Sequence, residues 1–287
     1  MRFFVATRRK KCYNVLKKSE EVAEMDNEFV FQTEHKNKIS AVRNDSIDFK
    51  EDLKAAKKGD PVAQYSVAYC YETGKGVKQN YAKAAKWYMK AAEQGDADAQ
   101  YNLGVYYFNG QGVKRDYAKA VELYIKAAEQ GNASAQNNLG FCYSKGYGIE
   151  LDDVKAVEWY RKAAEQGDAM AQCNLGFSYS QGYGIELDYG KAIEWYRKAA
   201  EQGDVGALCN LGGCYYNGRG VTQSYEKAVE WYIKAAEQGD ACAQYDLGVC
   251  YELGRGVEQN YTKAKEWYRK SEAQGYVLAY RALKRLR

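Results

Sequence analysis

Seven glycines recur every 36 residues through most of this 287-residue chain. They are Gly59, Gly95, Gly131, Gly167, Gly203, Gly239 and Gly275. Near-copies of one sequence lie between them, of which residues 96–131 are representative. A repeat period between about 20 and 50 residues is typical of stacked arrays, in which each unit buries its apolar surface against its neighbours. The spacing therefore predicts a repeat fold rather than a domain built around one central core.

The first half of each copy has the pattern of an amphipathic helix, here called helix A. Asp96 is a residue type that caps helix N-termini, and Leu103 and Tyr107 lie on one face of a helix expected over about residues 97–109. Gly110 should end this helix, because glycine readily adopts the positive φ of a C-cap. Each copy therefore begins with a helix that is followed by a tight loop.

A glycine also recurs in the middle of helix A. The positions are Gly104, Gly140, Gly176, Gly212 and Gly248, with Ala68 in the first copy. A glycine inside a helix costs about 1 kcal/mol relative to alanine. We therefore expect a neighbouring helix to approach closely at this point, with the small side chains of Ala120 and Ala127 and their equivalents facing the glycine.

The second half of each copy predicts another helix, helix B. Its expected N-caps are Asn80, Asp116, Asp152, Asp188, Ser224 and Asn260. One face carries alanine, tyrosine and, in five copies, a tryptophan that we expect in the core: Trp87, Trp159, Trp195, Trp231 and Trp267. The opposite face carries glutamate and lysine four residues apart, as at Glu158 and Lys162. Such pairs stabilise a solvated helix surface by only about 0.2–0.5 kcal/mol each.

These patterns together identify a family resemblance. The phrases A-x-A-Q-x-N-L-G-x-x-Y, G-x-G-V and K-A-x-x-W/L-Y-x-K-A-A-E-Q-G resemble the Sel-1-like repeat family over residues 60–287. The resemblance implies an all-α fold, a right-handed α/α superhelical solenoid related to tetratricopeptide arrays, with six full helix-turn-helix repeats and terminal half-repeats. It also implies an adaptor for protein complexes.

The chain changes character near residue 47. Residues 1–47 contain no glycine, hold the only histidine (His35), and run from a basic start into an acidic stretch. We expect residues 1–47 to be a charged N-terminal segment, poorly ordered or loosely helical, and residues 48–287 to be the repeat solenoid. An N-terminal half-repeat is expected at 46–58. The last half-repeat, from 276, carries Lys284 where the glycine should be and is expected to be a polar closing cap.

Several classes of protein are disfavoured by the same sequence. No apolar run reaches the roughly 18 residues of a membrane span, and Phe3–Ala6 is too short for the apolar core of a signal peptide. We therefore predict a cytoplasmic protein, although secretion by a route without a signal peptide stays open. The eight cysteines form no regular pairs and are expected to be free thiols.

No residue combination suggests catalysis or a cofactor. Zinc-type spacings of cysteine and histidine are absent, no nucleophile has a base near it in sequence, and the G-x-G pairs follow helices rather than strands. The sequence therefore predicts no catalytic, cofactor-binding or metal-binding residue.

Function is expected where the copies differ. Four columns of helix A vary from repeat to repeat. The first runs from Val62 to Cys242, the second from Tyr65 to Tyr245, the third from Tyr69 to Val249 and the fourth from Glu72 to Glu252. Their spacing of i, i+3, i+7 and i+10 places them on one helix face, which lines the concave surface in the resembled architecture. We predict that this face binds a peptide or helix of another protein. The predicted partner-binding residues are Tyr65, Tyr69, Asp98, Tyr101, Asn102, Val105, Phe108, Asn137, Asn138, Phe141, Met170, Asn174, Phe177, Asn210, Tyr216 and Tyr245. The asparagines are expected to supply amide donors and acceptors to the partner.

Three alternatives remain. The columns could be packing positions between repeats, most of all the column from Tyr69 to Val249. The resemblance to cysteine-rich relatives implies a β-lactam hydrolase-like activity as a second alternative. The third is a binder of nucleic acid or acidic surfaces through the basic ends, Arg2–Lys18 and Arg281–Arg287. Lys and Arg alternate with Glu along helix B, which argues against nucleic acid. The sequence does not specify the partner or the oligomeric state.

Overall fold

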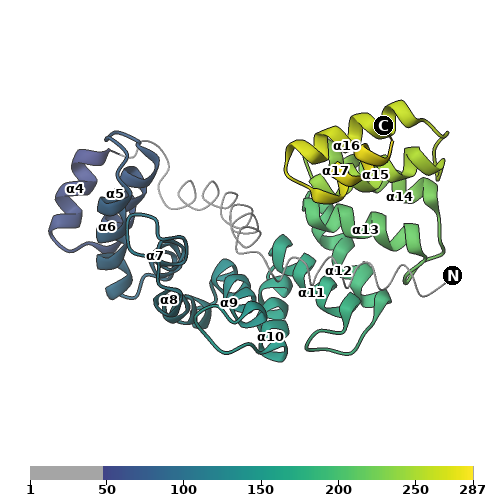
Figure 1. Ribbon diagram of the computed structural model, residues 1–287. Coiled ribbons are helices and arrows are strands. Elements are labelled where there is room, and N and C mark those ends of the chain that lie inside the picture. Colours follow the sequence, from purple (N-terminus) through teal and green to yellow (C-terminus); the bar gives the residue numbers. More distant parts are fainter. Residues whose placement is uncertain (1–47, 287) are drawn as a thin grey trace. The chain divides into compact units, whose positions relative to one another are not determined.

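The computed structural model describes residues 48–286, which form fourteen α-helices and no strand (Figure 1). The predicted all-α fold is confirmed for these residues, while the expectations for residues 1–47 lie outside the described part. The chain divides into two compact units after Leu123. No helix in the described range is both long enough and apolar enough to cross a membrane.

The first unit contains one short helix followed by helix pairs. Its helices are α4 (Phe49–Lys57), α5 (Pro61–Thr73), α6 (Tyr81–Glu93) and α7 (Ala97–Asn109), and α8 (Tyr117–Glu129) begins in it. Each of α4, α5 and α6 packs against the next helix along the chain. The α4 helix corresponds to the expected N-terminal half-repeat.

The second unit repeats this arrangement along its whole length. After the end of α8 it contains α9 (Ala133–Lys145), α10 (Asp153–Glu165), α11 (Ala169–Gln181), α12 (Tyr189–Glu201), α13 (Val205–Asn217), α14 (Tyr225–Glu237), α15 (Ala241–Leu253), α16 (Tyr261–Ala273) and α17 (Val277–Arg285). From α9 onward each helix packs against its successor (Figure 1). Each odd-numbered helix from α5 to α15 is a helix A, and the even-numbered helix after it is the helix B of the same repeat.

Local sequence signals account for the helix ends. The Asp96 carboxylate accepts a hydrogen bond of 2.6 Å from the backbone N–H of Ala99, and Gly110 closes α7 with φ of 71°. The expected helix at 97–109 is therefore confirmed to the residue. Pro61 occupies the first position of α5, where its missing N–H removes no helical hydrogen bond.

The glycine inside helix A does mark a close approach, but the facing group differs from our expectation. A Cβ atom on Gly140 would lie 2.8 Å from Cδ1 of the Tyr160 ring and 3.0 Å from the carbonyl oxygen of Ala156. The same contact recurs between Gly176 and Tyr196. The glycine therefore accommodates the buried tyrosine of helix B, and the small alanine side chains are not the main facing surface.

The tryptophans of helix B are half-buried rather than in the core, which corrects our prediction. A lysine three residues later lies over each ring, with the Lys162 ammonium 3.8 Å from the Trp159 centroid. The other such pairs are Lys90 on Trp87, Lys198 on Trp195, Lys234 on Trp231 and Lys270 on Trp267. Lys162, expected to pair with Glu158, thus makes a cation–π contact, which holds the indole at the edge of the core.

Buried glutamines of helix A connect this helix both to the preceding repeat and to the helix B of its own repeat. The Gln172 amide donates to the carbonyl oxygen of Ala164 at 3.1 Å, and its own oxygen accepts from Gln202 Nε2 at 2.9 Å. Equivalent glutamine pairs are Gln64 with Gln94, Gln136 with Gln166, and Gln244 with Gln274. Leu208 occupies this position in α13, and a pocket of about 480 Å³ lies beside it, next to Trp231 and Gln238.

The last helix closes the stack with a mixed surface. Ala279 and Ala282 of α17 are buried, and Lys284 is exposed at the position where full repeats carry the mid-helix glycine. Val277 and Tyr280 are 58% and 52% exposed. The predicted closing helix is present, but its outer surface carries apolar as well as basic side chains.

Candidate functional site

The surface with the predicted partner-binding residues is formed by the four variable columns of α5, α7, α9, α11, α13 and α15, and is called the helix A face here. Four of the predicted residues are buried: Asn102, Phe108, Asn137 and Asn138. Phe177 is exposed. The others are half-buried: Tyr65, Tyr69, Asp98, Tyr101, Val105, Phe141, Met170, Asn174, Asn210, Tyr216 and Tyr245. The helix A face is therefore a partly open surface with a buried polar layer beneath it.

That polar layer links neighbouring helices. In the first unit Asn102 Nδ2 donates to the Tyr65 hydroxyl at 3.1 Å. In the second unit Asn174 Nδ2 donates to Asn137 Oδ1 at 2.9 Å, and the equivalent amide of Asn210 lies 3.8 Å from the Cys173 sulfur. Amides that we expected to meet a partner thus make hydrogen bonds between repeats.

Side chains of the fourth variable column make hydrogen bonds with the hydroxyls of buried helix B tyrosines. The Tyr88 hydroxyl donates to Glu72 Oε2 at 2.6 Å, and Ser180 Oγ lies 3.2 Å from the Tyr196 hydroxyl. Tyr268 likewise donates to Glu252 at 2.7 Å. Burial raises the pKa of these phenols, so they remain neutral donors that need an acceptor in the interior. The packing alternative therefore applies to this column.

The third column carries Phe177, the one exposed residue of the predicted set, although the packing alternative was expected to apply there most of all. Phe141 and Phe177 occupy equivalent positions of α9 and α11. Each ring lies beside a loop tyrosine, with centroids 5.9 Å apart for Phe141 and Tyr147 and 6.1 Å apart for Phe177 and Tyr183. Phe177 and Tyr183 are each 39% exposed. Two consecutive repeats therefore present the same aromatic pair.

Sequence reasoning missed the loop tyrosines. A signal was available, because their column also changes from copy to copy: Lys75, Gln111, Tyr147, Tyr183, Arg219 and Arg255. In the later repeats this column is cationic. The Arg255 guanidinium donates to the Tyr216 hydroxyl at 2.5 Å and lies 5.3 Å from the Tyr225 ring centroid. Within the second unit the loop position beside the helix A face thus changes from tyrosine after α9 and α11 to arginine after α13 and α15.

The described thiols do not resemble activated nucleophiles. Burial raises the pKa of Cys70 to about 11 and the pKa values of Cys142 and Cys250 to about 12. A reactive cysteine requires a shift in the opposite direction, because the thiolate is the attacking species. These three residues therefore act as small core side chains.

The C-terminal basic end is described as far as Leu286. Arg285 makes two contacts with the Glu252 carboxylate, at 2.6 and 2.7 Å, so its charge is compensated. The stretch Arg2–Lys18 and Arg287 lie outside the described residues.

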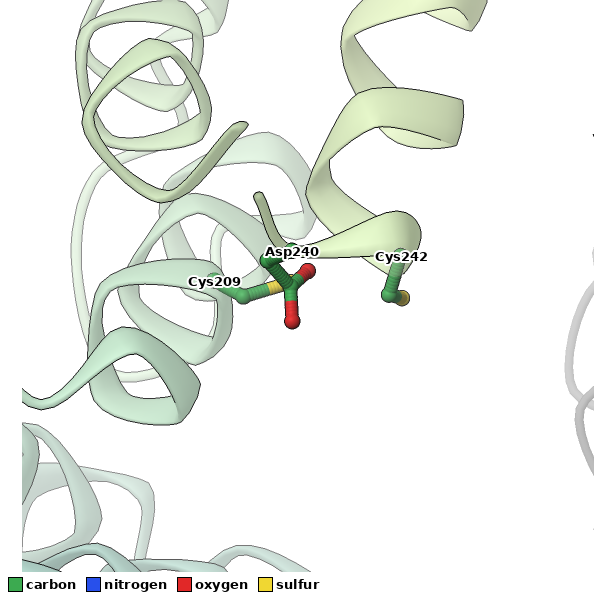
Figure 2. A group of neighbouring side chains, drawn as sticks. All are labelled: Cys209, Asp240 and Cys242. Carbon is green, nitrogen blue, oxygen red and sulfur yellow. The ribbon is translucent and has the colours of Figure 1, made fainter. Parts of the chain in front are cut away.

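One cluster offers metal-binding atoms. Among the described residues, ligand atoms of Cys209, Asp240 and Cys242 all lie within 4.8 Å of one another (Figure 2). The expectation of no metal-binding residue rested on ligands close together in sequence. Such spacing does not reveal this set, because its members come from two repeats.

Comparisons with known proteins agree with the fold. The Sel1 repeat model matches six segments, residues 61–96, 97–132, 133–168, 169–204, 205–240 and 243–276. A protective antigen of uropathogenic Escherichia coli strains with an SLR fold is 39% identical, with a TM-score of 0.73, over 83% of this chain and 51% of that chain. A Sel1 repeat protein from Oxalobacter formigenes is 36% identical, with a TM-score of 0.71, over 78% of this chain and 94% of its own.

A more distant structure shows the fold alone. It is an immunity protein, PA5088 from Pseudomonas aeruginosa, which is 20% identical with a TM-score of 0.50, over 80% of this chain and 83% of that chain. This chain spans about half the length of the E. coli antigen. The search of curated proteins found no match to this chain.

Proposed function

Because this chain belongs to the Sel1 repeat family, we propose that it is a non-enzymatic scaffold that binds a segment of another protein on its helix A face. Proteins with these repeats are generally interaction scaffolds, and the family is typically non-catalytic. The observation that carries the proposal is the aromatic pair that recurs on consecutive repeats, Phe141 with Tyr147 and Phe177 with Tyr183.

Partly exposed aromatic side chains are suited to binding. They provide a large apolar area at a small cost in side-chain entropy, and they are enriched among the residues that dominate interface energetics. Phe177 and Tyr183 each expose 39% of their surface, although burial of such rings is favourable. A partner segment with apolar side chains would cover both pairs.

The partner's charge follows from the neighbouring loops. Arg219 and Arg255 stand where the preceding repeats carry Tyr147 and Tyr183. A segment that continues from the aromatic pairs toward α13 and α15 would therefore meet two guanidinium groups. We propose an extended or helical segment that combines apolar side chains with acidic ones.

Site-specific photo-crosslinking tests this proposal in the native host. A photoreactive residue at Phe177 or Tyr183 should crosslink a discrete protein, and the double change Phe141→Ala with Phe177→Ala should abolish its co-purification. Both substitutions remove partly exposed rings, so the helical circular dichroism should be retained.

The matched control uses two other exposed apolar residues. Leu151 and Leu187 precede α10 and α12 and are 55% and 49% exposed. Crosslinks from these positions should be weak, and Leu151→Ala with Leu187→Ala should leave co-purification intact. Equal capture from both pairs of positions would mean nonspecific apolar contact and would refute the proposal.

A further inference from the structure

Three potential metal ligands converge between α13 and α15 in the second unit. Cys209 lies on α13, Asp240 is the N-cap of α15, and Cys242 lies in the first turn of α15 (Figure 2). Their sulfur and carboxylate oxygen atoms are within 4.8 Å of one another, and all three residues are half-buried. Cys209 is 31 residues from Asp240 and 33 from Cys242, so only the stacking of two helices A unites them.

We propose that Cys209, Asp240 and Cys242 bind a thiophilic divalent cation of the zinc class. Two thiolates and a carboxylate are ligands that Zn²⁺ accepts, at about 2.3 Å for sulfur and about 2.0–2.2 Å for oxygen. Tetrahedral bonds of these lengths place ligand atoms roughly 3.5–4 Å apart. Side-chain movements of less than about 1 Å would therefore close the present arrangement around an ion.

Neighbouring groups surround the three ligands. The backbone N–H of Ala243 donates to one Asp240 oxygen at 2.5 Å, which orients the carboxylate at the start of α15. An Asp246 carboxylate oxygen lies 4.0 Å from the Cys242 sulfur, outside the set of three converging ligands. The Tyr276 hydroxyl lies 3.7 Å from the same sulfur, as an outer-shell donor.

The charge balance favours a cation. The groups facing Cys209 from α13, α15 and the start of α17 are Asp240, Cys242, Asp246 and Tyr276, which are acidic or neutral at pH 7. Binding of one divalent cation would replace the S–H bond of each thiol with a metal–sulfur bond and release both protons. The affinity for the cation should therefore fall as the pH is lowered.

The preceding repeat contains an incomplete copy of the same site. Cys173 and Asp204 hold the positions of Cys209 and Asp240, but Gly206 stands where Cys242 would be. A Cβ atom on Gly206 would lie 3.4 Å from the Cys173 sulfur, so a side chain at this position would contact that sulfur. This copy therefore lacks one of the three ligands, and Asn210 stands where Asp246 would be. This copy supplies both a control and a gain-of-function test within one chain.

The test measures metal binding to the full chain after reduction and treatment with a chelator. Wild-type protein should bind one equivalent of Zn²⁺ in competition with a chromogenic chelator, and Co²⁺ should give a thiolate-to-cobalt charge-transfer band. Cys209→Ser and Cys242→Ser should each abolish the band. Asp240→Asn should weaken binding without loss of the helix cap, because Asn132 caps α9 in the same way, accepting from Ala135 N–H at 2.8 Å.

Two variants of the preceding repeat make the result specific. Cys173→Ser should leave one equivalent bound, and Gly206→Cys should add a second. Substoichiometric binding by the wild-type chain, or equal loss in Cys173→Ser and Cys209→Ser, would overturn the proposal. A Cys209–Cys242 disulfide on air oxidation, with no metal band in the reduced chain, would overturn it in favour of a thiol pair.

Discussion

At the scale of single residues, glycine is used where a neighbouring side chain leaves no space. Gly212 and Gly213 are consecutive in α13, yet their surroundings differ. A Cβ atom on Gly212 would lie 2.5 Å from Cδ1 of Tyr232, whereas a Cβ atom on Gly213 would meet only the Tyr232 hydroxyl, at 3.9 Å. Both residues have ordinary helical φ, so backbone strain does not distinguish them.

These two glycines should therefore respond oppositely to alanine. Gly212→Ala should lower the free energy of unfolding by about 1–3 kcal/mol, because the added methyl group overpacks the tyrosine ring. Gly213→Ala should raise it by up to about 1 kcal/mol, because alanine favours the helix and the space is open. Urea unfolding followed by circular dichroism measures both, and a shift of both midpoints in one direction would contradict the steric explanation.

At the scale of helices, paired glutamines join helix A to the end of helix B within one repeat. Gln202 and Gln238 are exposed residues at the C-caps of α12 and α14. Gln202 donates to the buried Gln172 at 2.9 Å, but the residue equivalent to Gln172 in the next repeat is Leu208. The chain thus contains the same cap residue with and without its glutamine partner.

Alanine at the two caps should separate the contribution of the glutamine pair. Gln202→Ala should destabilise the protein by about 0.5–1.5 kcal/mol, the usual value of one hydrogen bond. Gln238→Ala should change stability by less than about 0.5 kcal/mol, as is usual for a surface substitution. Thermal or urea unfolding gives both values. Equal losses of stability in the two variants would mean that the cap glutamine acts through the helix end and not through its hydrogen bond to the buried glutamine.

At the scale of the whole molecule, stability should depend on nearest neighbours. The described helices contact mainly the helix before and the helix after them, and the chain divides into two compact units after Leu123. Repeat arrays of this kind have stabilities close to a sum of local terms, so one unit can open while another stays folded.

Hydrogen exchange can test this locality with the overpacked variant. Gly212→Ala should reduce amide protection in α13 and α14 and in the helices adjoining them. Protection in α5 and α6 of the first unit should remain as in the wild-type chain, because these helices are not neighbours of α13 or α14 and their local stability terms are unchanged. A uniform loss of protection across both units would show that the chain unfolds as one cooperative block.

Several predictions from the sequence were correct because they rest on short-range chemistry. The helix at 97–109 follows from an aspartate cap and a glycine stop, both of which act within one turn. The tryptophans were placed wrongly, because an apolar position in a helix pattern does not show that a lysine such as Lys162 will cover the ring. The burial of Asn137 was missed for a similar reason, since its partner Asn174 belongs to the next repeat.

The 36-residue period, the helix ends and the need for a small residue inside helix A are determined by the sequence alone, because caps, backbone preferences and periodic burial act along the chain. Exposure of Phe177, the inter-repeat amides and the meeting of Cys209 with Cys242 were decided only by the tertiary structure. Side chains about one repeat apart meet only once their helices stack. Their contacts then depend on the direction of each side chain across that interface, which spacing in the sequence does not specify.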